Sequence, residues 1–126
     1  MIPKYRAWDK RDKKSYLVDE IVWDDGKFDS IGDAITFYRG AEEVELMQST
    51  GLKDKNGKEI FEKDILDYNG RKVIVKWHGS YACFIYEFVD ELKNRTAEWQ
   101  PLYLSYYKFE IIGNIYENPE MLEVTE

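Results

Sequence analysis

The sequence predicts a mainly β protein with an antiparallel, barrel-like fold and short helical turns. Short segments rich in Val, Ile and aromatic residues alternate with turn-forming dipeptides at spacings of about 8 to 12 residues, which is typical of β-barrels and sandwiches. Hydrophobic residues make up 44% of the 126 residues and aromatic residues 16%, a composition that favours packed sheet over disorder. The length favours a single domain spanning residues 1–126, with a core that needs no metal or disulfide staple.

The first half of the chain contains a highly charged turn and a strong hairpin signal. Residues 9–14 are too charged for a core and are expected to form a loop or hairpin tip. Asp25-Gly26 indicates a type I′ turn, because both central residues of that turn have positive φ. Residues 31–34 read as an irregular turn. The strands expected here cover residues 2–8, 15–23, 27–30, 35–39 and 43–48.

The second half follows a polar block centred on Asn56-Gly57, a second hairpin-type turn, and Asn69-Gly70 forms a third. The block suggests an alternative division into an N-terminal lobe, 1–48, and a barrel-like lobe, 58–118. A proline suits the first position of a helix, so one helical turn is expected after Asn118. Residues 90–100 read as a loop or short helix. The strands expected here cover residues 64–68, 71–77, 81–89, 103–107 and 109–116.

The charge of the chain is unevenly distributed. The net charge is −7, from 18 basic and 25 acidic residues, yet residues 1–14 contain six basic residues against two aspartates, a local +4. An acidic chain with one basic segment is not typical of a general nucleic-acid binder. Such a run usually forms a solvated surface, and the alternative is contact with phosphate or an acidic partner.

Aromatic clusters provide the other candidate surface. Aromatic side chains could stack on single-stranded nucleic acid, but such platforms need adjoining Lys and Arg, which are few here. Most of these rings are expected in the core, and exposed Tyr and Trp side chains would suit a protein interface. The candidate partner-binding residues from both surfaces are Arg6, Trp8, Lys10, Arg11, Lys13, Lys14, Trp77, Tyr81 and Tyr106.

Recognisable catalytic and cofactor-binding patterns are missing from the sequence. The glycines of the polar block are spaced one residue too far apart for a phosphate loop, and Glu59 stands where a magnesium-binding Ser or Thr is needed. The block also lacks the third oxygen ligand before the glycine and the distal glutamate of a calcium loop. His78 and Cys83 are single residues of their kinds, too few for zinc, and alternation along one strand would turn them to opposite faces. We therefore expect no enzyme activity, no cofactor and no metal.

The segment at residues 46–65, LMQSTGLKDKNGKEIFEKDI, resembles the YopX family of small phage and prophage proteins. Residues 4–9, KYRAWD, and 112–120, IGNIYENPE, are similar to the family's terminal motifs, in the expected order. The family often has glycine at the position of Lys63. The resemblance implies an origin in phage or prophage DNA, a cytoplasmic setting and a mostly β fold, but no activity or catalytic residues. Residues 58–77 are also similar to the start of a small SH3-like barrel, which is an analogy of fold alone.

Two functions therefore remain as hypotheses. The first is a non-enzymatic protein-binding module that contacts a phage or host protein, suggested by the acidic charge and the spare aromatic residues. The alternative is a nucleic-acid-binding accessory protein of phage replication or recombination, suggested by the basic first segment. No apolar stretch is long enough to span a membrane, and open strand edges would allow a homo-oligomer.

Overall fold

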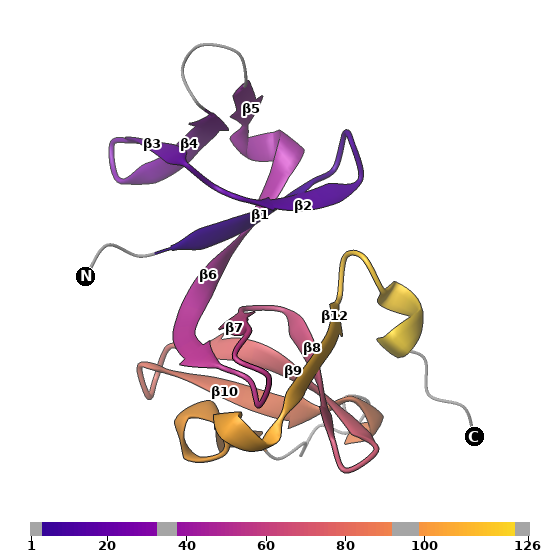
Figure 1. The fold of residues 1–126 in the computed structure, drawn as a ribbon. Coiled ribbons are helices and arrows are strands. Elements are labelled where there is room, and N and C mark those ends of the chain that lie inside the picture. The colour runs from indigo at the N-terminus through magenta and orange to yellow at the C-terminus, as the bar shows by residue number, and fades with distance from the viewer. Residues whose placement is uncertain (1–3, 33–37, 92–98, 123–126) are drawn as a thin grey trace. The chain divides into compact units, whose positions relative to one another are not determined.

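The computed structural model describes residues 4–32, 38–91 and 99–122, and these form antiparallel strands joined by turns and short 3-10 helices (Figure 1). The predicted mainly β, antiparallel fold is confirmed, and one of the sheets forms a half-barrel. The chain divides into two compact units, residues 1–48 and 49–126. Whether the chain acts as a single domain stays a prediction.

The first unit contains a hairpin sheet and a small three-stranded sheet. Strand β1 (Tyr5–Asp9) lies between β2 (Lys14–Leu17) and the first part of β6 (Val44–Lys53). Antiparallel pairing places Ala7 opposite both Tyr16 and Leu46. Ala7, Ile31 and Val44 form its buried core. The small sheet consists of β3 (Glu20–Asp24), β4 (Lys27–Gly32) and β5 (Tyr38–Gly40), in that order. The 3-10 helix η1 (Ala41–Glu43) lies between β5 and β6 in the chain.

The single strand predicted over residues 15–23 is wrong. The segment forms two strands, β2 and β3, which belong to different sheets and are separated by a bend at Val18 and Asp19. The inward side chains change parity across this bend, because Tyr16 and Val18 pack on the core before it and Ile21 packs on the core after it. The irregular turn predicted at 31–34 is also partly wrong, since residues 31 and 32 belong to β4; residues 33 and 34 lie outside the described part of the chain.

The second unit is built on a five-stranded antiparallel sheet. Its strands are, in order, β11 (Trp99–Pro101), β10 (Cys83–Phe88), β9 (Arg71–His78), β8 (Asp64–Tyr68) and β12 (Glu110–Asn114). Seven buried side chains form its core, among them Ile60, Leu66 and Phe109. The second unit also contains the end of β6 and the short strand β7 (Glu59–Phe61). Its 3-10 helices are η2 (Val89–Glu91), η3 (Leu102–Leu104), η4 (Tyr106–Lys108) and η5 (Pro119–Leu122).

The strand predicted over residues 103–107 is also wrong. Two 3-10 helices, η3 and η4, occupy this segment. The aromatic residues favour strand by local propensity, but Leu102 and Phe109 on either side are fully buried. Burial of these two side chains in the core overrides the local propensity, and the chain between them forms two helical turns. The helical turn predicted after Asn118 is confirmed as η5.

The predicted hairpin turns follow the expected backbone chemistry at two of three positions. Asp25 and Gly26 have φ of 51° and 77°, and Asn69 and Gly70 have φ of 50° and 87°. Both pairs therefore have the two positive φ values of a type I′ turn. At the polar block only Gly57 has a positive φ, 81°. A buried aspartate stabilises this third turn instead.

Asp54 is the residue that organises the polar block. One of its carboxylate oxygens accepts hydrogen bonds from the backbone N–H groups of Asn56 and Lys58, both at 2.9 Å, and the other accepts one from Ile111 at 3.0 Å. Burial raises the pKa of the Asp54 carboxyl, but these hydrogen bonds and the charge of Lys58 outweigh it, so the pKa is lowered. The block is thus a capped turn that ties β6–β7 to β12.

Candidate functional site

Asp9 anchors the charged hairpin of the first unit. Its side chain is fully buried at the end of β1. One carboxylate oxygen accepts hydrogen bonds from the backbone N–H groups of Arg11 and Asp12, at 2.9 and 3.1 Å. The other accepts one from the Tyr16 hydroxyl and one from Nε of Arg39, both at 2.9 Å. The carboxylate therefore fixes both the hairpin turn and the position of Tyr16.

Arg39 joins the hairpin to the three-stranded sheet within the same unit. It lies on β5, opposite Ile31 of β4. Besides its 2.9 Å ion pair with Asp9, its guanidinium forms a 2.9 Å ion pair with Asp12 and donates to the Tyr38 carbonyl. A planar guanidinium suits such a multiple role, because its donors project in a fixed fork.

The environment of this cluster shifts the pKa values of Asp9 and Tyr16. Burial raises the pKa of the Asp9 carboxyl, but hydrogen bonds from Asp12, Tyr16 and Arg11 and the charge of Arg39 outweigh burial, so the pKa is lowered. Burial and the hydrogen bond to Asp9 raise the pKa of the Tyr16 phenol. Asp9 is therefore ionised and Tyr16 is a neutral donor at neutral pH.

The basic residues of the hairpin tip differ in their partners. Lys10 forms a 3.0 Å ion pair with Glu45, and Arg11 lies 4.0 Å from Glu43. Within the described ranges, Lys13 and Lys14 form no ion pair. Lys13 occupies the tip with a φ of 58°, and Lys14 begins β2. The local positive charge that is left uncompensated is therefore concentrated at these two residues.

The other two candidates of the first segment are more enclosed. Arg6 and Trp8 are half-buried on β1. The guanidinium of Arg6 donates to Sδ of Met47 at 3.2 Å, and Trp8 has interactions of its own. The Arg6 contact joins β1 to β6 within the hairpin sheet.

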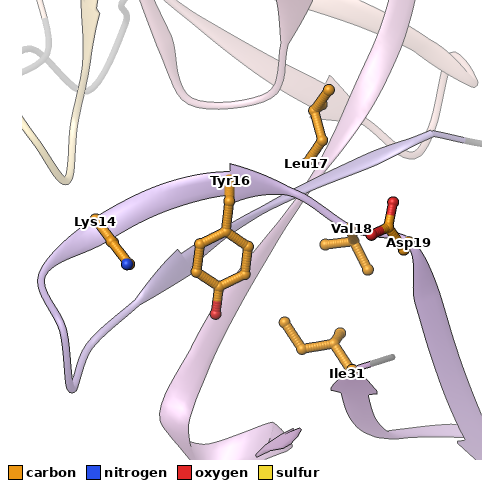
Figure 2. Close-up of a pocket in the computed structure, with 7 residues that line it drawn as sticks. Lys14, Tyr16, Leu17, Val18, Asp19 and Ile31 are labelled. Carbon is orange, nitrogen blue, oxygen red and sulfur yellow. The ribbon is translucent and has the colours of Figure 1, made fainter. Parts of the chain in front are cut away.

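An apolar pocket with a volume of about 250 Å³ lies beside β2. It is lined by residues 14 and 16–19, from β2 and the bend after it, and by residues 31 and 32 at the end of β4. Figure 2 shows Tyr16 and Val18 pointing toward Ile31, whereas Leu17 points to the opposite side of the β2 ribbon. Lys14 points to the same side as Tyr16. The walls are mainly apolar, with a positive side chain and Asp19 among the lining residues.

The three aromatic candidates lie in the second unit. Trp77 is 49% exposed and packs edge-on against Phe84, with ring centroids 5.0 Å apart. Tyr81 is 66% exposed and contacts the rings of His78 and Trp99, each at 5.0 Å.

Tyr106 is partly buried and packs against the core of the second unit, with Tyr107 5.6 Å away. His78 and Cys83 are directly opposite each other on β9 and β10, so the expectation that they face opposite sides is wrong. That expectation treated them as neighbours on one strand, but a turn between them brings them into register. The described residues give no group of three or more His, Cys, Asp or Glu side chains that could hold a metal.

Sequence reasoning did not find the pocket or the residues that support it. The sequence predicts a strand at Tyr16 and Val18, an irregular turn at Ile31 and a charged loop at Asp9. A sequence signal for Asp9 does exist, because an aspartate two or three residues before backbone N–H groups of a tight turn commonly caps that turn. No sequence signal brings Ile31 beside Tyr16, since they belong to different sheets.

The fold and the site define a small antiparallel β protein whose first unit carries an apolar pocket beside an edge strand. The chain belongs to the YopX family, whose model, described as YopX protein, matches residues 4–123. It is similar to the crystal structure of protein EF1440 from Enterococcus faecalis, with 32% sequence identity and a TM-score of 0.70. That similarity covers 98% of this chain and 99% of the other. A comparison with curated proteins found no match. No helix within the described ranges is long and apolar enough to cross a membrane.

Proposed function

We propose that this chain is a non-enzymatic protein-binding module of phage or prophage origin that contacts a phage or host protein in the cytoplasm. The observation that carries the proposal is the apolar pocket beside β2, next to exposed Leu17 and to the two lysines without an ion pair. A volume of about 250 Å³ is below the roughly 300 Å³ at which small-molecule sites usually begin. It suits one or two side chains of a partner protein.

The surface around the pocket also has the character of a protein contact. Leu17 is 67% exposed, and covering an exposed leucine removes apolar area from water, which favours association. Lys13 and Lys14 add a localised positive charge, which favours an acidic partner by electrostatic complementarity.

The same charges support a protein partner over nucleic acid. Binding to nucleic acid depends on several uncompensated Lys and Arg residues that neutralise phosphates. In this hairpin, Lys10 and Arg11 are already paired with Glu45 and Glu43. The whole chain carries a net charge of −7, which opposes approach to a polyanion.

The test is capture of partners by the immobilised full chain from a bacterial lysate that contains the induced phage, with and without nuclease. Each captured protein is then purified, and its direct binding to the chain is measured. We expect a directly binding protein whose capture survives nuclease. We expect binding to weaken for the double variant Lys14→Glu with Leu17→Asp and not for Lys72→Glu, an exposed charge reversal in the second unit.

Two results would overturn the proposal. Capture that disappears with nuclease would favour the nucleic-acid alternative, in which binding weakens steeply as salt is raised. Direct binding that is equal for the double variant and the Lys72→Glu control would show that the surface around β2 is not the binding surface.

A further inference from the structure

Strand β2 has an unpaired outer edge. In the sheet order β2-β1-β6-β7 it is the first strand, and no other strand of the described chain pairs with it. The backbone N–H of Val18 donates to the Tyr5 carbonyl at 3.0 Å, so the even-numbered residues direct their backbone groups toward β1. Because alternate residues of a strand direct these groups to opposite sides, the N–H and C=O groups of Ser15 and Leu17 point away from the sheet.

This edge lies beside the pocket. Tyr16 belongs to β2 and lines the pocket with Val18 and Ile31. A further strand on this edge would place one of its residues directly opposite Tyr16. That position is a non-hydrogen-bonded pair, because the backbone of Tyr16 bonds to β1, and in such pairs the facing side chains approach most closely. A side chain at that position would project on the pocket side of the sheet.

We propose that the partner of this chain binds as an added antiparallel β-strand on β2, a mode that rests on the protein-binding function proposed above. Its backbone bonds the free groups of Ser15 and Leu17. An aliphatic side chain opposite Tyr16 enters the pocket toward Ile31. An acidic side chain two residues farther along the partner lies opposite Lys14. The partner segment is therefore extended, with an aliphatic residue followed two positions later by Asp or Glu.

The charges near the edge set where an acidic residue of the added strand lies. Lys14 and Asp19 come before and after the centre of the pocket along the chain, and neither forms an ion pair with a described residue. An acidic residue is attracted toward Lys14 and repelled near Asp19. An antiparallel partner meets that arrangement when its acid follows the aliphatic residue, whereas a parallel partner would need the acid first. Antiparallel pairing is also slightly the more stable per residue.

Proline at Ser15 provides a selective test of this binding mode. The Ser15 N–H points outward, so Ser15→Pro removes a free donor and places the ring on the outer edge while it leaves the bonds to β1 in place. Proline is tolerated at such edge positions for this reason. It requires an extended residue before it, and Lys14 already lies in β2. Ser15→Ala is the matched control, because it keeps the N–H.

The experiment selects displayed random twelve-residue peptides on the full chain and measures binding of the enriched peptides in solution by fluorescence anisotropy. We expect enrichment of an aliphatic residue followed two positions later by an acid. Ser15→Pro should weaken binding at least tenfold relative to Ser15→Ala. If Ser15→Pro does not fold, Leu17→Pro and its control Leu17→Ala form a second pair for the same comparison. Lys14→Glu should weaken binding of the acidic peptide and strengthen binding of its Asp-to-Lys or Glu-to-Lys counterpart.

Three results would overturn the inference. Equal binding by the folded proline and alanine variants would exclude strand addition, and enrichment of the acid before the aliphatic residue would exclude the antiparallel direction. Sedimentation that shows a dimer disrupted by Ser15→Pro would assign the edge to a second copy of this chain. If the proline variants still bind a captured protein that the double variant Lys14→Glu with Leu17→Asp does not bind, the binding function stands and only the strand-addition mode fails.

Discussion

Asp9 combines complete burial with four hydrogen bonds to its carboxylate, three of them from neighbouring residues of the hairpin. Asp9→Asn keeps the size of the side chain but replaces one acceptor oxygen by a donor that faces Arg39 or the backbone. Breaking one side of a buried charge pair costs about 3 kcal/mol, so we expect a loss of that order in the free energy of unfolding. Chemical denaturation of the two proteins measures it, and a loss below about 0.5 kcal/mol would contradict the structural role of Asp9.

The lowered pKa of Asp9 and Asp54 predicts the direction of the pH dependence. Both carboxyls have a folded pKa below the ordinary value of 3.8, so the unfolded chain binds protons more readily than the folded chain. Their contribution to stability is complete above the unfolded pKa and is lost as the pH falls through the folded pKa. We expect the free energy of unfolding to fall as the pH is lowered below about 4, with a smaller change in Asp9→Asn. If the free energy of unfolding of this variant had the same pH profile as that of the unchanged protein, the lowered pKa of Asp9 would be contradicted.

Lys63 holds a backbone conformation that favours glycine. Its φ is 69°, and both of its backbone groups are fixed, since its N–H donates to the Val75 carbonyl at 2.9 Å and its carbonyl accepts from Ile115 at 3.1 Å. The side chain of Asp64 stabilises the same turn by accepting from the Phe61 N–H. The tight turn thus persists although lysine stands where the family often has glycine.

Lys63→Gly is therefore expected to stabilise the protein relative to Lys63→Ala, which removes the same side chain but keeps the Cβ atom. The left-handed conformation costs a residue with a Cβ about 1 kcal/mol, and the greater freedom of glycine in the unfolded chain offsets part of that gain. We expect the glycine variant to be more stable by about 0.5 kcal/mol, measured by thermal unfolding. A glycine variant less stable than the alanine variant would show that the turn relaxes.

At the scale of elements, the closing turn depends on a close approach between Gly113 of β12 and Asn118. A Cβ atom on Gly113 would lie 2.3 Å from Oδ1 of Asn118, the oxygen that accepts the Asn114 N–H at 3.2 Å. Gly113→Ala must displace this side chain and break its hydrogen bond. We expect a loss of about 2 kcal/mol, typical of overpacking at a close contact.

A double-mutant cycle separates this clash from other effects of the alanine. Asn118→Ala removes the hydrogen bond and the clash together, so Gly113→Ala should cost much less in that background. The double variant is then more stable than the sum of the single losses predicts, as coupled neighbours require. Additive losses from urea unfolding would mean that the cost of Gly113→Ala arises from the backbone alone.

The elements also show which part of the fold is readable from sequence. The turns at Asp25-Gly26 and Asn69-Gly70 were predicted because their chemistry is local. The break between β2 and β3 was not, because residues 15–23 contain no Gly or Pro to mark it, and pairing with two different partners divides them. A sign of the break is present in the sequence, because apolar side chains occur at both even and odd positions of this segment.

At the scale of the whole molecule, the residues that carry the family resemblance serve mainly as turn caps and close contacts. Asp9, Asp54, Asp64 and Asn114 are all buried polar residues, and each accepts backbone hydrogen bonds. Their positions could be read from the sequence, but their burial could not. The pocket depends on bringing β2 beside the end of β4, a tertiary arrangement that leaves no local pattern, so the candidate site was only partly predictable.

The two compact units differ in the size of their cores. Among the described residues, three buried side chains form the core cluster of the first unit and seven form that of the second. Stability in a protein is distributed over cooperative units that open with different free energies. We therefore expect amide hydrogens of β9 to exchange more slowly than those of β1, as measured by native-state hydrogen exchange.

A core substitution in the second unit tests whether the units open separately. Leu66 is fully buried there, and Leu66→Ala is expected to cost about 3 kcal/mol through lost burial and a residual cavity. Exchange should then accelerate for β8, β9 and β10, while protection of the β1–β2 hairpin stays unchanged. The control is Leu104→Ala, which removes a 57% exposed leucine of the same unit and should leave both profiles as they are. Equal acceleration in both units by Leu66→Ala would show that β6, the strand that continues from one unit into the other, couples them into a single cooperative structure.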